Sequence, residues 1–113
     1  MFGLQLLDHG GGWSWADVSS EDIYRVAQVC KDLESMRALE LLSTRRNKAI
    51  PFTSLAPEAQ RRLTDIGLDD YDKLWELRVA ALARIWGICQ EHIFYLVWWD
   101  PDHEVCPSPK KHT

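Results

Sequence analysis

The sequence predicts an α+β domain in which helices cover one face of a small antiparallel sheet. Three observations predict this class. Hydrophobic and polar residues alternate at the N-terminus, apolar residues recur at helical spacing through the middle of the chain, and strand-like alternation returns beyond Asp72. The expected order is one strand, two or three helices and a three-stranded meander. The chain has 113 residues, 46% of them hydrophobic, which suits a single domain over residues 1–113.

The N-terminal half is expected to hold one strand and the first helix. The strand covers residues 2–8, where apolar side chains alternate. Ser19 or Ser20 begins the helix, because a capping hydroxyl followed by acidic residues favours helix initiation. The apolar stripe of this helix continues to Leu42, either in the same helix or in a second one.

A further helix and three strands are expected in the C-terminal half. Pro57 suits the first turn of the helix, and Gly67 is placed to end it. The strands are expected over residues 73–79, 84–89 and 92–99. Short connections make antiparallel neighbours of them. The last strand is apolar on both faces, which is typical of a central strand covered on both sides.

Tryptophan is unusually abundant, with six copies in the chain. Trp13 and Trp15 lie in a glycine-rich loop, and we expect one of them to be exposed, where it would stack on a base or anchor a partner. Trp98 and Trp99 are adjacent in a strand, so their side chains point to opposite faces of the sheet. We therefore expect one of these two to line a groove.

Cysteine usage and hydropathy indicate a cytoplasmic protein. The three cysteines are widely spaced and odd in number, which does not suit a disulfide framework. The N-terminus lacks the basic region of a signal peptide. The longest apolar run, residues 93–99, is far shorter than the roughly 20 residues that span a bilayer. We expect no membrane partner.

Charge is arranged in blocks along the chain. The net charge is −4, which taken alone argues against a nucleic-acid binder. Residues 41–64, however, carry a net charge of +4, and the C-terminal tail adds +2. Residues 1–40 carry −4 and residues 65–104 carry −6. The basic blocks suit a local phosphate-binding face, and equally a face that meets an acidic partner.

Three strand motifs resemble the RelE/ParE superfamily of bacterial toxins, closest to its HigB-like and phage-encoded branch. They are KLWELR at residues 73–78, RIWGI at 84–88 and HIFYL at 92–96. The ending WWDPDHEVCPSPKKHT, residues 98–113, looks like the tail of a group of small bacterial and phage proteins. The resemblance implies a RelE-like fold, an antitoxin partner and an endoribonuclease that cleaves messenger RNA, typically on the ribosome and without a metal. It is equally compatible with a gyrase-type inhibitor or another non-catalytic interaction module.

The resemblance also assigns candidate catalytic residues. Arg84, which opens its strand, matches an arginine of the family and is expected to stabilise the phosphate. Arg78 ends the preceding strand and is expected to lie across the hairpin from it, or equally to be an edge arginine paired with Glu76 or Glu91. His103 follows the last strand, and is expected to act as general acid or base because imidazole titrates near neutrality. The expected RNA-binding residues are Arg45, Arg46, Lys48, Arg61, Lys110, Lys111 and His112.

Two alternative chemistries involve the same C-terminal region. His103 and Cys106 have the spacing of a zinc half-site that His112 would extend, but no second half-site accompanies it. Cys106 with a histidine is also a possible nucleophilic pair. We expect neither a metal nor another cofactor.

Overall fold

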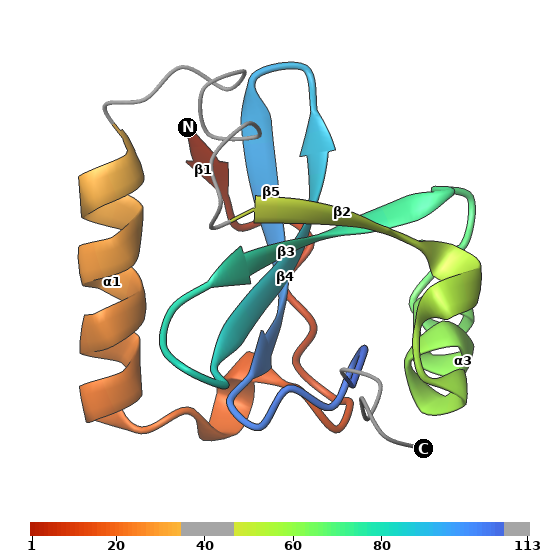
Figure 1. Ribbon diagram of the computed structural model, residues 1–113, viewed down its shortest axis with the longest axis horizontal. Helices are drawn as coiled ribbons and strands as arrows, with labels where there is room; N and C mark the ends of the chain where they lie inside the picture. Colours follow the sequence, from red (N-terminus) through yellow and green to blue (C-terminus); the bar gives the residue numbers. More distant parts are fainter. Residues whose placement is uncertain (35–46, 108–113) are drawn as a thin grey trace, which may run out of the picture.

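A five-stranded mixed sheet forms the centre of the protein (Figure 1). The structure is a computed structural model and describes residues 1–34 and 47–107. The strands lie in the order β1-β5-β4-β3-β2, in which β1 runs parallel to β5 and every other neighbouring pair is antiparallel. Their bounds are Phe2–Gly3 for β1, Asn47–Pro51 for β2, Lys73–Arg78 for β3, Arg84–Gln90 for β4 and Ile93–Asp100 for β5. The predicted α+β class and C-terminal meander are confirmed.

The first two strands differ from the sequence prediction. β1 ends at Gly3 instead of reaching Asp8, because the chain turns after it and the Leu7 amide donates to the Leu4 carbonyl. β2 was not predicted. It is short, ends in Pro51 and pairs only with β3 in the sheet described. Proline is tolerated there because an edge position does not require its missing N–H.

Within residues 1–34 and 47–107, two α-helices flank the sheet, α1 at Ser20–Glu34 and α3 at Pro57–Asp65. Ser19 Oγ accepts a hydrogen bond from the Asp22 amide, which confirms the predicted start of α1. Gly67 follows α3 with a φ of 77°, a left-handed conformation that glycine adopts without steric cost. Two short 3₁₀ helices, Trp15–Asp17 and Phe52–Ser54, complete the described elements. The continuation of the first helix toward Leu42 lies outside the described residues.

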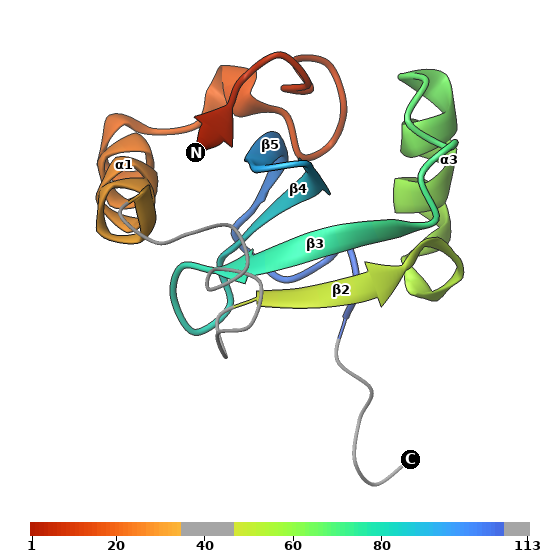
Figure 2. The same cartoon turned by 90° about the horizontal axis from the view of Figure 1, so that it is seen from above.

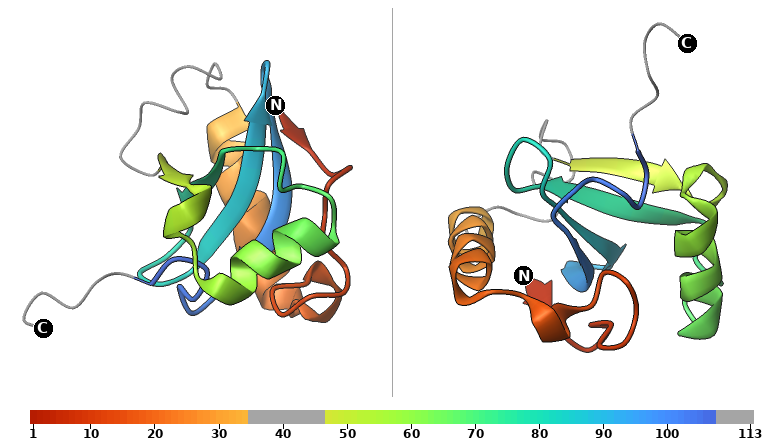
Figure 3. Two further views of the ribbon diagram at one scale, coloured as in Figure 1. Left: turned by 90° about the vertical axis from the view of Figure 1, so that its right-hand side faces the viewer. Right: turned by 90° about the horizontal axis from the view of Figure 1, so that it is seen from below.

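The helices lie on opposite faces of the sheet, so the prediction of a single covered face was wrong (Figures 2 and 3). Strand residues alternate between the two faces and are apolar on both, so each face needs a cover. On one face, Val26, Val29 and Leu33 of α1 pack with Leu77, Ile85, Phe94, Leu96 and Trp99. On the other, Ala59 and Leu63 of α3 pack with Leu74, Trp86, Ile88, Val97 and Trp98.

This two-sided core corrects both tryptophan predictions. Trp98 and Trp99 are 0% and 5% exposed, one in each core cluster. Trp13 is buried with its ring centroid 5.1 Å from that of Trp98. Trp15 is half-buried and donates from Nε1 to the Val97 carbonyl at 3.0 Å. The four indoles therefore contribute to the core and to loop anchoring, and neither loop tryptophan is exposed.

No helix within the described ranges is long and apolar enough to cross a membrane. Cys30 and Cys89 are half-buried and pack against the core cluster that α1 covers. Burial is the main cause that raises the pKa of each thiol to about 11. Both sulfurs are therefore expected to be protonated and weakly nucleophilic at neutral pH.

The β4–β5 turn provides a test of backbone strain. Gln90 pairs with Ile93, so Glu91 and His92 form a two-residue turn, and Glu91 has a φ of 59°. Relief of the left-handed strain, about 1–2 kcal/mol, exceeds the entropy that glycine adds to the unfolded chain. Glu91→Gly is expected to raise the free energy of unfolding by about 0.5–1 kcal/mol. Urea denaturation measures the change, and Gln90→Gly, within β4, should instead destabilise the protein.

Candidate functional site

A groove of about 570 Å³ opens beside the N-terminus of α3, and it contains two of the predicted site residues. Three parts of the chain form it: the N-terminal loop, the start of α3 and the segment that follows β5. Figure 3 shows this last segment crossing the sheet toward α3. The lining residues are Trp13, Ala56, Pro57, Glu58, Arg61, Asp102, His103, Glu104 and Pro107.

Asp8 fixes the N-terminal loop to α3 and to the sheet. Its carboxylate accepts hydrogen bonds from Arg62 Nε at 2.9 Å, Arg62 Nη2 at 2.7 Å and Trp98 Nε1 at 2.8 Å. The Gly10 amide donates a fourth at 3.0 Å. The Arg62 hydrogen bond is the largest cause that holds the pKa of Asp8 far below its usual value, against the opposing effect of burial. Asp8 is therefore ionised at neutral pH.

Backbone hydrogen bonds join the walls of the groove. The Ala56 amide, at the start of α3, donates to the Val105 carbonyl at 2.7 Å. The Trp99 amide donates to the Trp13 carbonyl at 3.1 Å. These bonds tie the helix to the C-terminal segment and the N-terminal loop to β5. The groove is therefore built on elements that are fixed to one another.

Asp100 organises the segment after β5. Its side chain is fully buried and accepts three N–H groups: the Glu104 amide at 2.8 Å, the Val105 amide at 3.0 Å and Trp86 Nε1 at 3.0 Å. Within the turn that these bonds close, His103 has a φ of 59°. Non-glycine residues adopt this conformation where their surroundings impose it, and such residues concentrate at functional sites.

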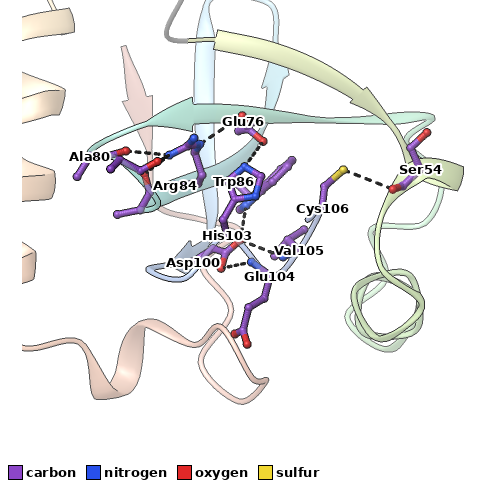
Figure 4. Close-up of polar contacts among 12 residues, drawn as sticks. Ser54, Glu76, Ala80, Arg84, Trp86, Asp100, His103, Glu104, Val105 and Cys106 are labelled. Carbon is purple, nitrogen blue, oxygen red and sulfur yellow. Dashed lines mark hydrogen bonds and ion pairs between the residues drawn. The ribbon is translucent and has the colours of Figure 1, made fainter. Parts of the chain in front are cut away.

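Three charged or titratable side chains meet at the sheet end of the groove (Figure 4). Arg84 Nε donates to Glu76 Oε1 at 3.3 Å, and His103 Nε2 lies 3.6 Å from Glu76 Oε2. Each of the three side chains is 10–11% exposed. Glu76 thus links the two residues that the sequence analysis placed at the catalytic centre.

Arg84 also binds the β3–β4 turn. Its Nη1 donates to the carbonyl oxygens of Ala80, Ala81 and Ala83, at 2.8, 3.2 and 3.1 Å. This turn lacks the glycine or asparagine usual in tight hairpins, and the guanidinium supplies hydrogen bonds in its place. Arg84 is therefore committed to protein groups through Nε and Nη1.

Arg78 is a neighbour of Arg84, but it takes no part in the contacts that join Arg84, Glu76 and His103. It pairs with Arg84 in the β3–β4 register, so both side chains leave the sheet on the same face. Arg78 is exposed, whereas Arg84 is buried. The expected position across the hairpin is confirmed, and the structure brings Arg84 and His103 together through Glu76.

The predicted RNA-binding residues are spread over several regions. Arg61 lines the groove together with His103. Lys48 is exposed on β2, at the opposite edge of the sheet from β1. Arg45, Arg46, Lys110, Lys111 and His112 lie outside the described residues. The groove wall also carries the exposed carboxylates of Glu58, Asp102 and Glu104, so its charge is mixed.

Cys106 and His103 point to different partners. Cys106 Sγ donates to the Ser54 carbonyl at 3.4 Å, whereas the His103 ring lies against Glu76. Burial, with a contribution from Glu76, raises the pKa of the Cys106 thiol. No group of three or more metal-ligating side chains occurs in residues 1–34 and 47–107, and His112 of the zinc alternative lies beyond them.

Three buried carboxylates at or near the groove, those of Glu76, Asp8 and Asp100, were not among the residues predicted from the sequence. Glu76 carried a signal: it is an acid among the apolar residues Leu74, Trp75 and Leu77 inside β3, on the same face as Leu74. Asp8 and Asp100 carried no comparable signal, because their hydrogen-bond donors lie far from them in the sequence. Their partners are 54 and 90 residues away for Asp8 and 14 residues away for the Trp86 bond of Asp100.

Comparison with known proteins yields no match for this chain, whether with protein-family models, curated proteins or solved structures.

Proposed function

We propose that this chain is a RelE-like toxin that cleaves messenger RNA, with His103 as its general base. The single observation that carries the proposal is the row Arg84–Glu76–His103, which ends at the groove. A histidine beside a groove, oriented by a buried carboxylate, suits proton transfer, and its left-handed backbone is a feature often found at functional sites. The resemblance of the three strand motifs supports the same class.

In the proposed reaction, Glu76 orients the imidazole. The carboxylate faces Nε2, so it favours the tautomer with the proton on Nε2 and leaves Nδ1 free to accept a proton. The contact of 3.6 Å is longer than a hydrogen bond, and catalytic contacts of this kind shorten when substrate binds. Arg84 holds the other oxygen of Glu76, so in this proposal it positions the carboxylate.

The chemical step is attack by a ribose hydroxyl on the adjacent phosphate. Nδ1 of His103 takes the proton of the 2′-hydroxyl, the 2′-oxygen bonds to phosphorus, and the bond from phosphorus to the 5′-oxygen breaks. The 5′-oxygen takes a proton from water, which leaves a 2′,3′-cyclic phosphate and a 5′-hydroxyl. His103 then releases its proton to solvent. No metal takes part in this mechanism.

Arg61 is the proposed phosphate-binding residue. It lines the groove with His103 and is exposed, so its guanidinium is available to a ligand. The same wall is formed by the first turn of α3, where Ala56 provides no side-chain cap, and the positive end of a helix favours a phosphate. Arg78, exposed on the same sheet face as Arg84, is proposed to contact the RNA backbone.

The proposed partners are an antitoxin that holds the chain inactive and the messenger RNA on the ribosome, in the cytoplasm. A second candidate function is a non-catalytic interaction module on the same fold. The three exposed carboxylates Glu58, Asp102 and Glu104 favour it, because they suit a basic protein segment better than a phosphate backbone.

One experiment separates the two candidates. The purified chain is incubated with messenger RNA, free and on translating ribosomes, and cleavage is followed by mapping of new 5′-hydroxyl ends. His103→Ala is expected to slow cleavage by about 10²–10⁴-fold, the usual contribution of a general base. His92→Ala, an exposed histidine in the β4–β5 turn, is the matched control and should cleave at the unsubstituted rate.

Two results would contradict the enzyme. In the first, His103→Ala cleaves as fast as the unsubstituted chain. In the second, the unsubstituted chain leaves RNA intact both with and without ribosomes, which would favour the interaction module. Expression in bacteria provides a parallel readout, since the enzyme should arrest growth and His103→Ala should relieve the arrest.

A further inference from the structure

The buried carboxylate of Asp100 has no role in the proposed chemistry, and yet it organises the segment that carries His103. We infer that Asp100 is a positioning residue for His103: it folds the segment after β5 so that the imidazole faces Glu76 and the groove. The catalytic consequence of this inference rests on the proposed function. The structural consequence, a fixed imidazole, holds for whatever process uses the groove.

The hydrogen bonds of Asp100 enclose His103 along the chain. Oδ1 accepts the Glu104 amide at 2.8 Å, and Oδ2 accepts the Val105 amide at 3.0 Å. The residue between Asp100 and these two amides that adopts a positive φ is His103, at 59°. Because both amides must point back toward β5 to reach one carboxylate, the backbone reverses at His103. The left-handed conformation is therefore a consequence of the bonds to Asp100.

The third bond of Asp100 ties this turn to the strands that hold Glu76 and Arg84. Trp86 Nε1 donates to Asp100 Oδ2 at 3.0 Å. Trp86 is the register partner of Glu76 on β3, and Arg84 is the register partner of Asp100 on β5. Asp100, which anchors the turn at His103, and Glu76, whose carboxylate faces His103, therefore lie in the same part of the sheet. This arrangement fixes the position of the imidazole relative to Glu76.

The anchor requires a carboxylate. Three N–H donors converge on Asp100, which is fully buried and has no ion-pair partner among the residues described. An ionised carboxylate is acceptor-only and satisfies all three donors. Asparagine would place an NH₂ group against at least one of them, because it offers a single oxygen. The isosteric substitution Asp100→Asn should therefore break at least one of these hydrogen bonds, while the volume of the side chain stays the same.

The test is Asp100→Asn, with Asp102→Asn as the matched control in the same segment. Asp102 is exposed, and no described hydrogen bond involves its side chain. The first readout is the ¹⁵N spectrum of the histidine imidazoles, which reports the tautomer of His103 and its contact with Glu76. Asp100→Asn is expected to abolish the tautomer preference of the unsubstituted chain, as Glu76→Gln should, whereas Asp102→Asn should retain it. A His103 signal unchanged in Asp100→Asn would overturn the inference.

The second readout is RNA cleavage by Asp100→Asn. A displaced general base should lower kcat by about 10–100-fold and leave KM within about twofold, since the groove wall that binds phosphate is formed mainly by α3. Loss of the tautomer preference in a chain that never cleaves RNA would support the positioning role and contradict the proposed function. Full kcat in Asp100→Asn, in a chain whose His103→Ala variant is inactive, would contradict the positioning role alone.

A measurement on the unsubstituted chain keeps the inference testable if Asp100→Asn does not fold. The amide protons of Glu104 and Val105 should exchange with solvent at least 100-fold more slowly than in an unstructured peptide, because both are bonded to a buried carboxylate. The Asp102 amide, which belongs to an exposed residue, is the internal reference. Unprotected Glu104 and Val105 amides would contradict the anchor.

Discussion

Replacing Asp8 with alanine is expected to lower the free energy of unfolding by about 3–5 kcal/mol. The substitution removes the charged partner of Arg62, which is 28% exposed, and the acceptor of Trp98 Nε1, which is buried. Domains have a total stability of about 5–15 kcal/mol, so this loss removes a large fraction of the stability. The cost exceeds that of a surface ion pair because four N–H groups lose their acceptor, and the Trp98 Nε1 among them is buried.

Urea denaturation followed by tryptophan fluorescence measures this change. Asp70→Ala is the matched control, since Asp70 is exposed in the loop before β3 and should alter stability by less than about 0.5 kcal/mol. Arg62→Ala should also destabilise the protein, because it leaves the buried Asp8 carboxylate without its charged partner, while the bonds from Trp98 and Gly10 remain. An Asp8→Ala variant as stable as Asp70→Ala would show that the hydrogen bonds of Asp8 make no net contribution to the free energy of unfolding.

The hydrogen bonds of Asp8 with Arg62 and Trp98 also predict that stability depends on pH. The pKa of Asp8 is lower in the folded state than in the unfolded chain, chiefly because of the Arg62 hydrogen bond. The unfolded state therefore binds the proton first, and the stabilisation is complete above the unfolded pKa of about 3.9 and decreases as pH falls below it. The unsubstituted protein should lose stability between about pH 5 and pH 2 more steeply than Asp8→Asn. Equal slopes would contradict the assignment.

Replacing Arg84 with alanine is the second change with a large expected effect, a loss of about 3 kcal/mol. The substitution leaves Glu76 buried without its guanidinium and removes hydrogen bonds from three carbonyl oxygens of the β3–β4 turn. A phosphate-binding arginine on the surface would give the opposite pattern, with lost activity and unchanged stability. The free energy of unfolding therefore distinguishes the positioning role from direct contact with RNA.

Two further variants make the Arg84 test specific. Arg78→Ala removes the neighbouring exposed arginine from the same sheet face and should change stability by less than about 0.5 kcal/mol. The double variant Glu76→Gln with Arg84→Ala should be more stable than Arg84→Ala alone, because neutral glutamine leaves no buried charge without a partner. Simple additivity in this cycle would mean that the two side chains do not interact.

Local patterns in the sequence were sufficient for α1, α3 and the β3–β5 meander. Their signals act within a few residues: Ser19 caps the first turn, Gly67 adopts a positive φ, and short apolar strands with short connections form the meander. The same patterns did not predict the face that each helix covers. That depends on long-range pairing, since strands apolar on both sides accept a helix on either one.

The candidate site, like the fold, could be predicted from the sequence only in part. The residues Arg84 and His103 were identified from the sequence, because motif positions are local. Their environment was not: a glutamate on β3 joins them, two buried aspartates hold the surrounding loops, and Arg84 is bound to a turn. Each of these contacts depends on strands brought into register by the folded sheet.

The sequence by itself determined which segments become helices and strands, because propensity, capping and alternation act over neighbouring residues. It also determined that a net charge of −4 conceals separate basic and acidic blocks. Only the tertiary structure decided what the buried charges do. Asp8, Glu76 and Asp100 are stabilised by donors from distant parts of the chain, and a carboxylate has a defined role only where those donors converge.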